Sequence, residues 1–188
     1  MTQIQHLTPK DYRDMPWKNG GGTTCELFRL PHPHRLEDFA LRLSIATVAS
    51  GGPFSIFPGI DRTLMLLEGE GMALQFSGEA AERVLDVPLQ PIAFPGEAAV
   101  DCRLLGGSLR DFNVMVARDW GRAHTQIIEG DFSMAEAGKD AVMQLAYVRA
   151  GRAQVGATQA QVHELLAWHG DMPIEGGGTL ILITVTAV

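Results

Sequence analysis

Two arginines in apolar, strand-like runs are the side chains of this sequence best suited to bind an anion. In FALRLSIATV (39–48), alternation puts Arg42, Ser44 and Ala46 on one face of a strand and larger aliphatic residues on the other. Arg62 opens the apolar run RTLMLLEG (62–69) and therefore lies at a strand end. A guanidinium that faces a cavity can bind a carboxylate through two hydrogen bonds. The alternative for Arg42 is a surface salt bridge.

A buried arginine requires an acidic partner, and Glu26 in TCELFRL (24–30) is the predicted partner of Arg62. That pair would be architectural, or would fix Arg62 for a ligand. In DFNVMVARD (111–119), Asp111 and Asn113 share a face. In a pocket, Asn113 would hydrogen-bond a ligand and Asp111 would hold a cation or an arginine. The alternative is that both are turn residues.

The stretch MPWKNGGGTTCEL (15–27) places Trp17, Lys18 and Asn19 directly before three glycines. Glycines allow backbone N–H groups to approach a ligand closely. Lys18 would attract an anion, and Asn19 can both donate and accept hydrogen bonds. The run lacks the GxxxxGK[ST] pattern of a phosphate loop. It is therefore interpreted as the rim of a binding pocket, or as a loop that closes a barrel with Trp17 as a plug.

The histidines do not form a recognisable metal site. His32 and His34 have the spacing of a ligand pair, but prolines surround them and they are predicted to lie in a surface loop. His163 and His169 lack a carboxylate at matching spacing. The sequence also shows no nucleophile–base pair. We expect no metal and no cofactor.

These residues belong to a succession of short strands. Apolar or alternating runs punctuated by Gly, Pro or Asp continue at 71–78, 98–107, 141–151, 152–157 and 179–188, whereas 159–168 fits a helix or a strand. The pattern predicts an all-β sandwich or barrel. LLEGEGMALQFSG (66–78) and YVRAGRAQVGA (147–157) both look like a strand, a glycine turn and a strand. This weak repeat indicates two barrels with a seam near residues 117–124.

Composition excludes several classes of protein. Hydrophobic residues make up 46% of the 188 residues, which argues against disorder, and the net charge of -7 without a basic cluster argues against a nucleic-acid partner. The sequence has no apolar run of about 18 residues and no apolar signal core, so we expect no membrane association and a cytoplasmic location.

The order of strand, glycine turn, strand and Pro-Gly turn resembles the cupin barrel. More specifically, WKNGGGTTCEL, LRLSIA (41–46), GPFSIFPGIDR (53–62), LLEGEGMAL (66–74) and DFNVM (111–115) together resemble the HutD/Ves family, bicupin proteins associated with histidine utilisation. Cupins usually hold a metal through histidines and a glutamate, but residues 54–69 contain no histidine and the glutamate position falls near Arg62. Leu41 also replaces a tryptophan that is usual in the family.

The resemblance implies an all-β, metal-independent bicupin. Its N-terminal barrel would span residues 1–120 and contain the pocket, and a degenerate C-terminal barrel would span 121–188. The predicted ligand-binding residues combine the rim, the polar groups and a phenylalanine wall: Trp17, Lys18, Asn19, Glu26, Arg42, Ser44, Phe54, Phe57, Arg62, Asp111 and Asn113.

Cations outnumber free acids in this set once Glu26 is paired, which predicts a small anionic carboxylate ligand. The resemblance implies a regulator or sensor in histidine utilisation that binds urocanate or formylglutamate. Two alternatives stay open. One is a cupin enzyme, a lyase or isomerase acting on a small organic acid. The other is an interaction module that forms a homodimer through its second barrel.

Overall fold

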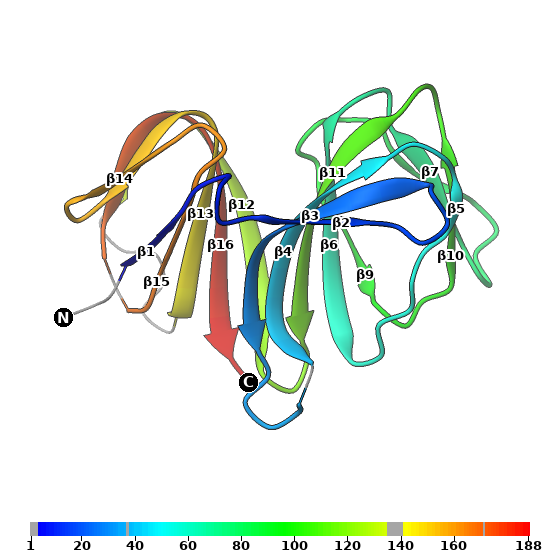
Figure 1. Ribbon diagram of the computed structural model, residues 1–188, viewed down its shortest axis with the longest axis horizontal. Coiled ribbons are helices and arrows are strands. Elements are labelled where there is room, and N and C mark those ends of the chain that lie inside the picture. The colour runs from blue at the N-terminus through cyan, green and yellow to red at the C-terminus, as the bar shows by residue number, and fades with distance from the viewer. Residues whose placement is uncertain (1–3, 37, 135–140, 171) are drawn as a thin grey trace. The chain divides into compact units, whose positions relative to one another are not determined.

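The computed structural model describes residues 4–36, 38–134, 141–170 and 172–188. Strands and no helices occur in these ranges, so the predicted all-β class is confirmed (Figure 1). None of the described residues belongs to a helix that could cross a membrane. The chain divides into two compact units, which are the pocket unit, Arg13–Trp120, and the terminal unit, residues 4–12 with Gly121–Val188.

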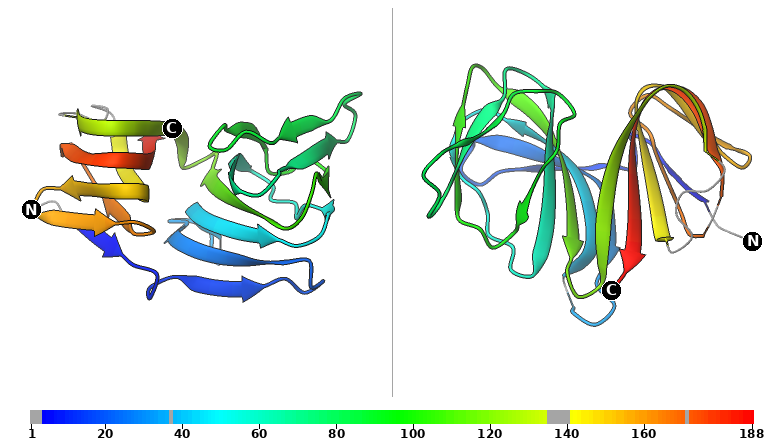
Figure 2. Two further views of the ribbon diagram at one scale, coloured as in Figure 1. Left: turned by 90° about the horizontal axis from the view of Figure 1, so that it is seen from above. Right: turned by 180° about the vertical axis from the view of Figure 1, so that it is seen from behind.

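The pocket unit consists of two antiparallel sheets that share one core (Figure 2). The larger sheet has the order β2-β3-β4-β11-β6-β9, and the smaller has the order β5-β10-β7-β8. The strands of the larger sheet span, in that order, Arg13–Pro16, Gly22–Pro31, Phe39–Val48, Leu109–Ala117, Ile60–Glu68 and Ile92–Pro95. Those of the smaller sheet span Gly52–Pro53, Val100–Leu104, Met72–Phe76 and Arg83–Leu85.

Side-chain alternation decides which residues face the interior of the pocket unit. On β6, Leu64 and Leu66 point into the core between the sheets and are completely buried. Arg62 precedes them with the same parity, so it faces the same interior. On β4, Ala46 and Val48 belong to this core, and Ser44 and Arg42 continue the same face. One end of the interior is therefore apolar and the other end carries polar groups.

The terminal unit is built on one sheet of order β1-β15-β13-β16-β12, with β14 paired to β13. These strands span Ile4–Leu7, Leu165–Trp168, Ala141–Val155, Ile174–Ala187, Gly121–Met134 and Thr158–Gln161. The segment 159–168, which fitted a helix or a strand, contributes to two strands. Because β1 pairs with β15, its residues lie in the terminal unit, whereas the predicted division placed them in the first barrel.

The turn predicted within residues 147–157 is wrong, because β13 runs through it as one continuous strand. Gly151 has a φ of 78° and lies opposite Gly178, next to a register shift between Val148 and Ala150. Glycine here allows a bulge and not a chain reversal. Its environment also excludes a side chain, since a Cβ on Gly151 would collide with the carbonyl oxygen of Gly177.

Candidate functional site

The polar end of the pocket unit opens into a cavity of about 560 Å³. Strands β4, β6 and β11 form one wall, and the loops that follow β2 and β4 form the rim. Ten of the eleven predicted ligand-binding residues line it: Trp17, Lys18, Asn19, Arg42, Ser44, Phe54, Phe57, Arg62, Asp111 and Asn113. Whether they bind a ligand stays a prediction, but the fold does gather them around one cavity.

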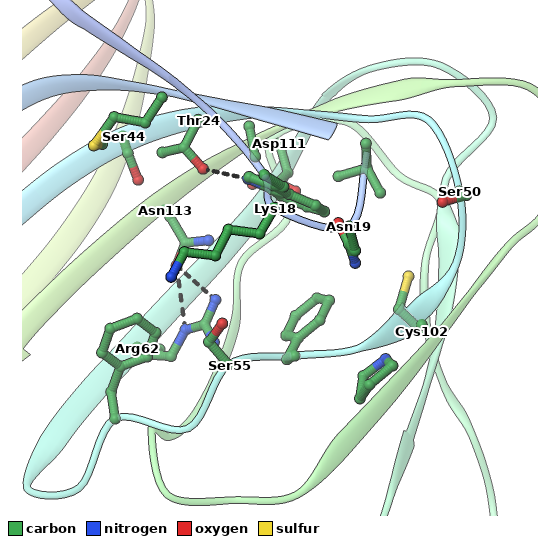
Figure 3. Close-up of a pocket in the computed structure, with 18 of the residues that line it drawn as sticks. Lys18, Asn19, Thr24, Ser44, Ser50, Ser55, Arg62, Cys102, Asp111 and Asn113 are labelled. Atoms are coloured by element: carbon green, nitrogen blue, oxygen red, sulfur yellow. Dashed lines mark hydrogen bonds between the residues drawn. The ribbon is translucent and has the colours of Figure 1, made fainter. Parts of the chain in front are cut away.

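Arg62 is a buried cation, with 7% of its surface exposed. Its guanidinium carbon lies 5.1, 5.8 and 5.0 Å from the ring centroids of Phe54, Phe57 and Phe94, within the range of cation–π attraction. Within the described chain, its hydrogen bonds go to Asn113 Oδ1, which accepts from Nε at 3.4 Å and from Nη2 at 3.3 Å (Figure 3). Both bonds are long, so the guanidinium keeps capacity to bind an anion.

Burial lowers the pKa of Arg62 to about 10, partly opposed by the attraction of Asp111. The guanidinium is therefore still protonated at neutral pH. Nearby Arg42 adds a smaller repulsion that also lowers this pKa. The aromatic rings stabilise the charge without neutralising it, because they carry no negative charge of their own.

Asp111 lies on β11 in the same interior and is 3% exposed. Its Oδ1 is buried and has no hydrogen-bond partner in the part of the chain that the structure describes. Burial raises the pKa of Asp111 to about 7, although the charge of Arg62 and hydrogen bonds from Asn113 and from the backbone of Ala46 lower it. Asp111 therefore changes its charge near neutral pH.

The predicted pairing of Glu26 with Arg62 is wrong. Glu26 Oε2 accepts a hydrogen bond from Arg42 Nε at 2.7 Å, and both side chains are largely buried at 13% and 14% exposure. β3 and β6 are three strand spacings apart in the sheet, about 14 Å at 4.8 Å per spacing, which is beyond the reach of this pair. Glu26 therefore neutralises Arg42, and it does not line the cavity.

The Trp-Lys-Asn-Gly segment has features of both predicted alternatives, a closing loop with Trp17 as a plug and the rim of a pocket. The indole N–H of Trp17 donates to Thr24 Oγ1 at 2.8 Å, and the ring packs against the core, as a plug would. A Cβ on Gly22 would lie 3.0 Å from the Trp17 ring and would collide with the carbonyl oxygen of Thr47. Gly22 is therefore required for close packing of the tryptophan.

The other rim residues leave polar groups at the cavity. Asn19 Oδ1 accepts a hydrogen bond from Gly21 N at 3.0 Å, which orders the turn and leaves the amide NH₂ of Asn19 at the cavity lining. The Lys18 side chain is exposed and extends along the cavity in the view of Figure 3. In that view Arg62 and Asn113 lie at one end, and Ser50 and Cys102 lie at the other.

The prediction missed several lining residues, among them Met15, Thr24, Ser50, Ser55, Cys102 and Met115. Met115 could have been found, because it shares the parity of Asp111 and Asn113 on β11. Ser50 and Cys102 could not, since their segments meet only through pairing of β5 with β10. Burial raises the pKa of the Cys102 thiol to about 11, so the thiol is protonated and unreactive.

The histidines lie outside this cavity. The loop predicted for His32 and His34 is present between β3 and β4, and His34 is exposed, but the His32 side chain is buried at 8% exposure. Its Nδ1 accepts hydrogen bonds from the backbone of His34 and Arg35, which folds the loop around the ring. In the terminal unit, His163 Nδ1 meets Tyr147 Oη at 3.0 Å. Across the described ranges, no three His, Cys, Asp or Glu side chains are grouped as metal ligands.

A family model described as HutD matches residues 9–183. The chain belongs to the HutD family. This confirms the predicted family. A 21.2 kDa protein in the hutC 3' region of Pseudomonas putida is 44% identical over 130 residues, which are 69% of this chain and 67% of the relative.

The solved structure of HutD from Pseudomonas fluorescens SBW25 is 35% identical to this HutD-family chain, with a TM-score of 0.87 over 99% of this chain and 100% of the other. The bacterial pirin YhhW from Escherichia coli is 13% identical, with a TM-score of 0.68 over 98% and 99% of the two chains, and shares the fold alone. The predicted bicupin fold is confirmed.

Proposed function

We propose that this HutD-family protein binds a small carboxylate in the cavity of its pocket unit and serves as a sensor or regulator in histidine utilisation. The observation that carries the proposal is Arg62, a buried cation in an aromatic cage that borders a cavity. Burying a guanidinium is costly. A pocket that keeps such a charge available is well suited to an anionic ligand.

The charge of the cavity supports an anion. Its charged lining residues are Lys18, Arg42, Arg62 and Asp111. Glu26 neutralises Arg42 from outside the lining. With Asp111 ionised the lining keeps one net positive charge once Arg42 is neutralised, and with Asp111 protonated it keeps two. In both states the net positive charge of the lining would repel a cationic ligand.

The lining favours an acid that carries, besides its carboxylate, an apolar or planar part and a second polar group. Phe54 and Phe57 beside the guanidinium give a flat apolar wall that suits a planar, conjugated acid. The far end offers the amide of Asn19 and the hydroxyl of Ser50. Urocanate, with a carboxylate and an imidazole, and formylglutamate, with carboxylates and a formamide, both fit this chemistry.

The test is thermal stabilisation by urocanate, formylglutamate, glutamate and histidine, measured on the wild type, on Arg62→Met and on Arg110→Met. Arg110 lies on the neighbouring strand β11, outside the cavity lining, and makes an ion pair with Glu68 of β6 at 3.4 Å, so its substitution is the matched control. A ligand at about 100 times its Kd adds about 2.7 kcal/mol. We expect one acid to stabilise the wild type and the control but not Arg62→Met. An absence of stabilisation of the wild type by every acid would refute the proposal.

One observation favours a second candidate, a lyase or isomerase acting on the same class of acid. Asp111 changes its charge near neutral pH beside the cavity, as a general acid or base would. The test is prolonged incubation of each stabilising acid with the protein, followed by NMR. New resonances that are absent with Asp111→Asn would support the enzyme.

A further inference from the structure

The buried carboxyl group of Asp111 shares its counter-charge with the proposed anion site. Asp111 is 3% exposed, and its Oδ1 has no hydrogen-bond partner among the described residues. The positive charge that acts on it is the guanidinium of Arg62. The same guanidinium is the group to which we assign the ligand's carboxylate. Two negative groups would therefore compete for one buried cation.

Among the described groups around Asp111, no second buried cation is left without a counter-charge of its own. From β4, Arg42 is already neutralised by Glu26 at 2.7 Å. From β10, Cys102 carries a thiol that stays protonated. From the rim, Lys18 is exposed, and its charge is weakened by solvent and salt.

Two carboxylates that share one site cannot both ionise without a large cost, and one of them takes a proton. We propose that Asp111 takes up one proton from solvent when an anion binds at Arg62, so that the pocket binds its ligand as an anion together with a proton. The inference rests on the carboxylate-binding function proposed above. The balance is simple: one solvent proton forms one O–H bond on Asp111, and the ligand keeps its charge.

The protonated Asp111 also gains a role in recognition. A neutral carboxyl group is a hydrogen-bond donor, whereas the ionised form only accepts. It could then donate to a ligand oxygen or to a water held by the ligand. Protonation removes the negative charge of Asp111, so the region around Arg62 and Asp111 favours an anion over a cation. Asp111 therefore contributes to ligand specificity.

The coupling predicts a definite pH dependence. In the free protein the pKa of Asp111 is about 7, so below that pH the proton is already bound and the affinity for an anion is constant. Above this pH, the binding of each anion requires Asp111 to take up one proton from solvent. The Kd therefore rises tenfold for each pH unit until the higher pKa of Asp111 in the complex is reached.

The experiment measures proton uptake directly. Neutralised sodium formate is added to the intact protein in weak buffer at pH 8.0 and at pH 5.5, and the acid needed to hold the pH is recorded. The bound fraction is taken from formate NMR line widths, and sodium chloride at the same ionic strength is the control. We expect about one proton for each bound formate at pH 8.0 and nearly none at pH 5.5.

Two variants locate the proton. Asp111→Asn should bind formate with no uptake at either pH and with a Kd that does not change with pH. Asp101→Asn removes an exposed carboxylate on β10 and should behave like the wild type. Uptake that persists in Asp111→Asn would overturn the assignment, and the wild-type result decides the coupling even if that variant does not fold.

The outcomes separate this inference from the function on which it rests. If formate binds to the wild type without proton uptake at pH 8.0, the coupling is wrong and the carboxylate site stands. If neither formate nor any acid of the panel binds, the proposed function fails, and the inference fails with it.

Discussion

The replacement of Asp111 by Asn should make the protein more stable at neutral pH, although it removes a buried charge next to an arginine. The pKa of Asp111 is about 7 in the folded protein and 3.8 is its ordinary value. Between these values the folded state holds a proton that the unfolded chain has released. Wild-type stability therefore falls as pH rises through this window, and the loss is complete above about pH 7.

The size of the effect follows from the pKa difference. At 1.36 kcal/mol per pH unit, the whole window corresponds to about 4 kcal/mol, of which about 2 kcal/mol falls between pH 5 and pH 7, because half of the proton is still bound at pH 7. Asparagine keeps the shape of the side chain but does not titrate. The unfolding free energy of Asp111→Asn minus that of the wild type should therefore increase by about 2 kcal/mol from pH 5 to pH 7 and change little from pH 7 to pH 8.

Urea unfolding at pH 5, 6, 7 and 8 measures this difference, because all other titrating groups are common to both proteins and cancel. Asp101→Asn is again the control, and its curve should run parallel to the wild type. Parallel curves for Asp111→Asn and the wild type over the same range would show that Asp111 is ionised in the folded protein across the whole window. The electrostatic reasoning about the pocket would then be refuted.

Three further substitutions test the rim and the buried ion pair by urea unfolding. Gly22→Ala should destabilise by about 1–3 kcal/mol, because the new methyl group would collide with the Thr47 carbonyl oxygen and crowd the Trp17 ring; an unchanged midpoint would contradict this close packing. Trp17→Phe should cost about 1 kcal/mol through the lost hydrogen bond to Thr24, and a larger loss would indicate a true plug. Glu26→Gln should cost about 2 kcal/mol, since Arg42 keeps a charge without its partner; no loss would contradict the pairing.

The strands and their interior faces were largely predictable from the sequence. The run 39–48 is β4 with the predicted bounds, and the run 111–119 corresponds to β11 at Leu109–Ala117. Period-two alternation correctly grouped Asp111 with Asn113, and Arg42 with Ser44. It could not tell which face was inside, because a face with an arginine is more often a surface. The core residues Leu64 and Leu66, in phase with Arg62, settle that question in three dimensions.

Partners across the sheet were not predictable, because they depend on strand order and register. Glu26 lies opposite Ser44, next to an irregularity in the pairing of β3 with β4, and this places its carboxylate beside Arg42. The strand that carries Arg62 is separated from β3 by β4 and β11. Sequence spacing contains no information about such an order. Similarly, Phe94 joins the aromatic cage only because β9 pairs with β6.

The pocket contains one constant charge and one adjustable charge. With a pKa of about 10, Arg62 stays protonated at every pH near neutrality, so its attraction for an anion does not vary. Asp111, with a pKa of about 7, decides how much of that attraction is free. The resemblance to cupins places Arg62 near the position of a metal-binding glutamate, in a chain whose cavity lining contains no histidine among the described residues. A guanidinium held by phenylalanine rings keeps a positive charge at this place, and a neighbouring carboxyl group can make its strength depend on pH.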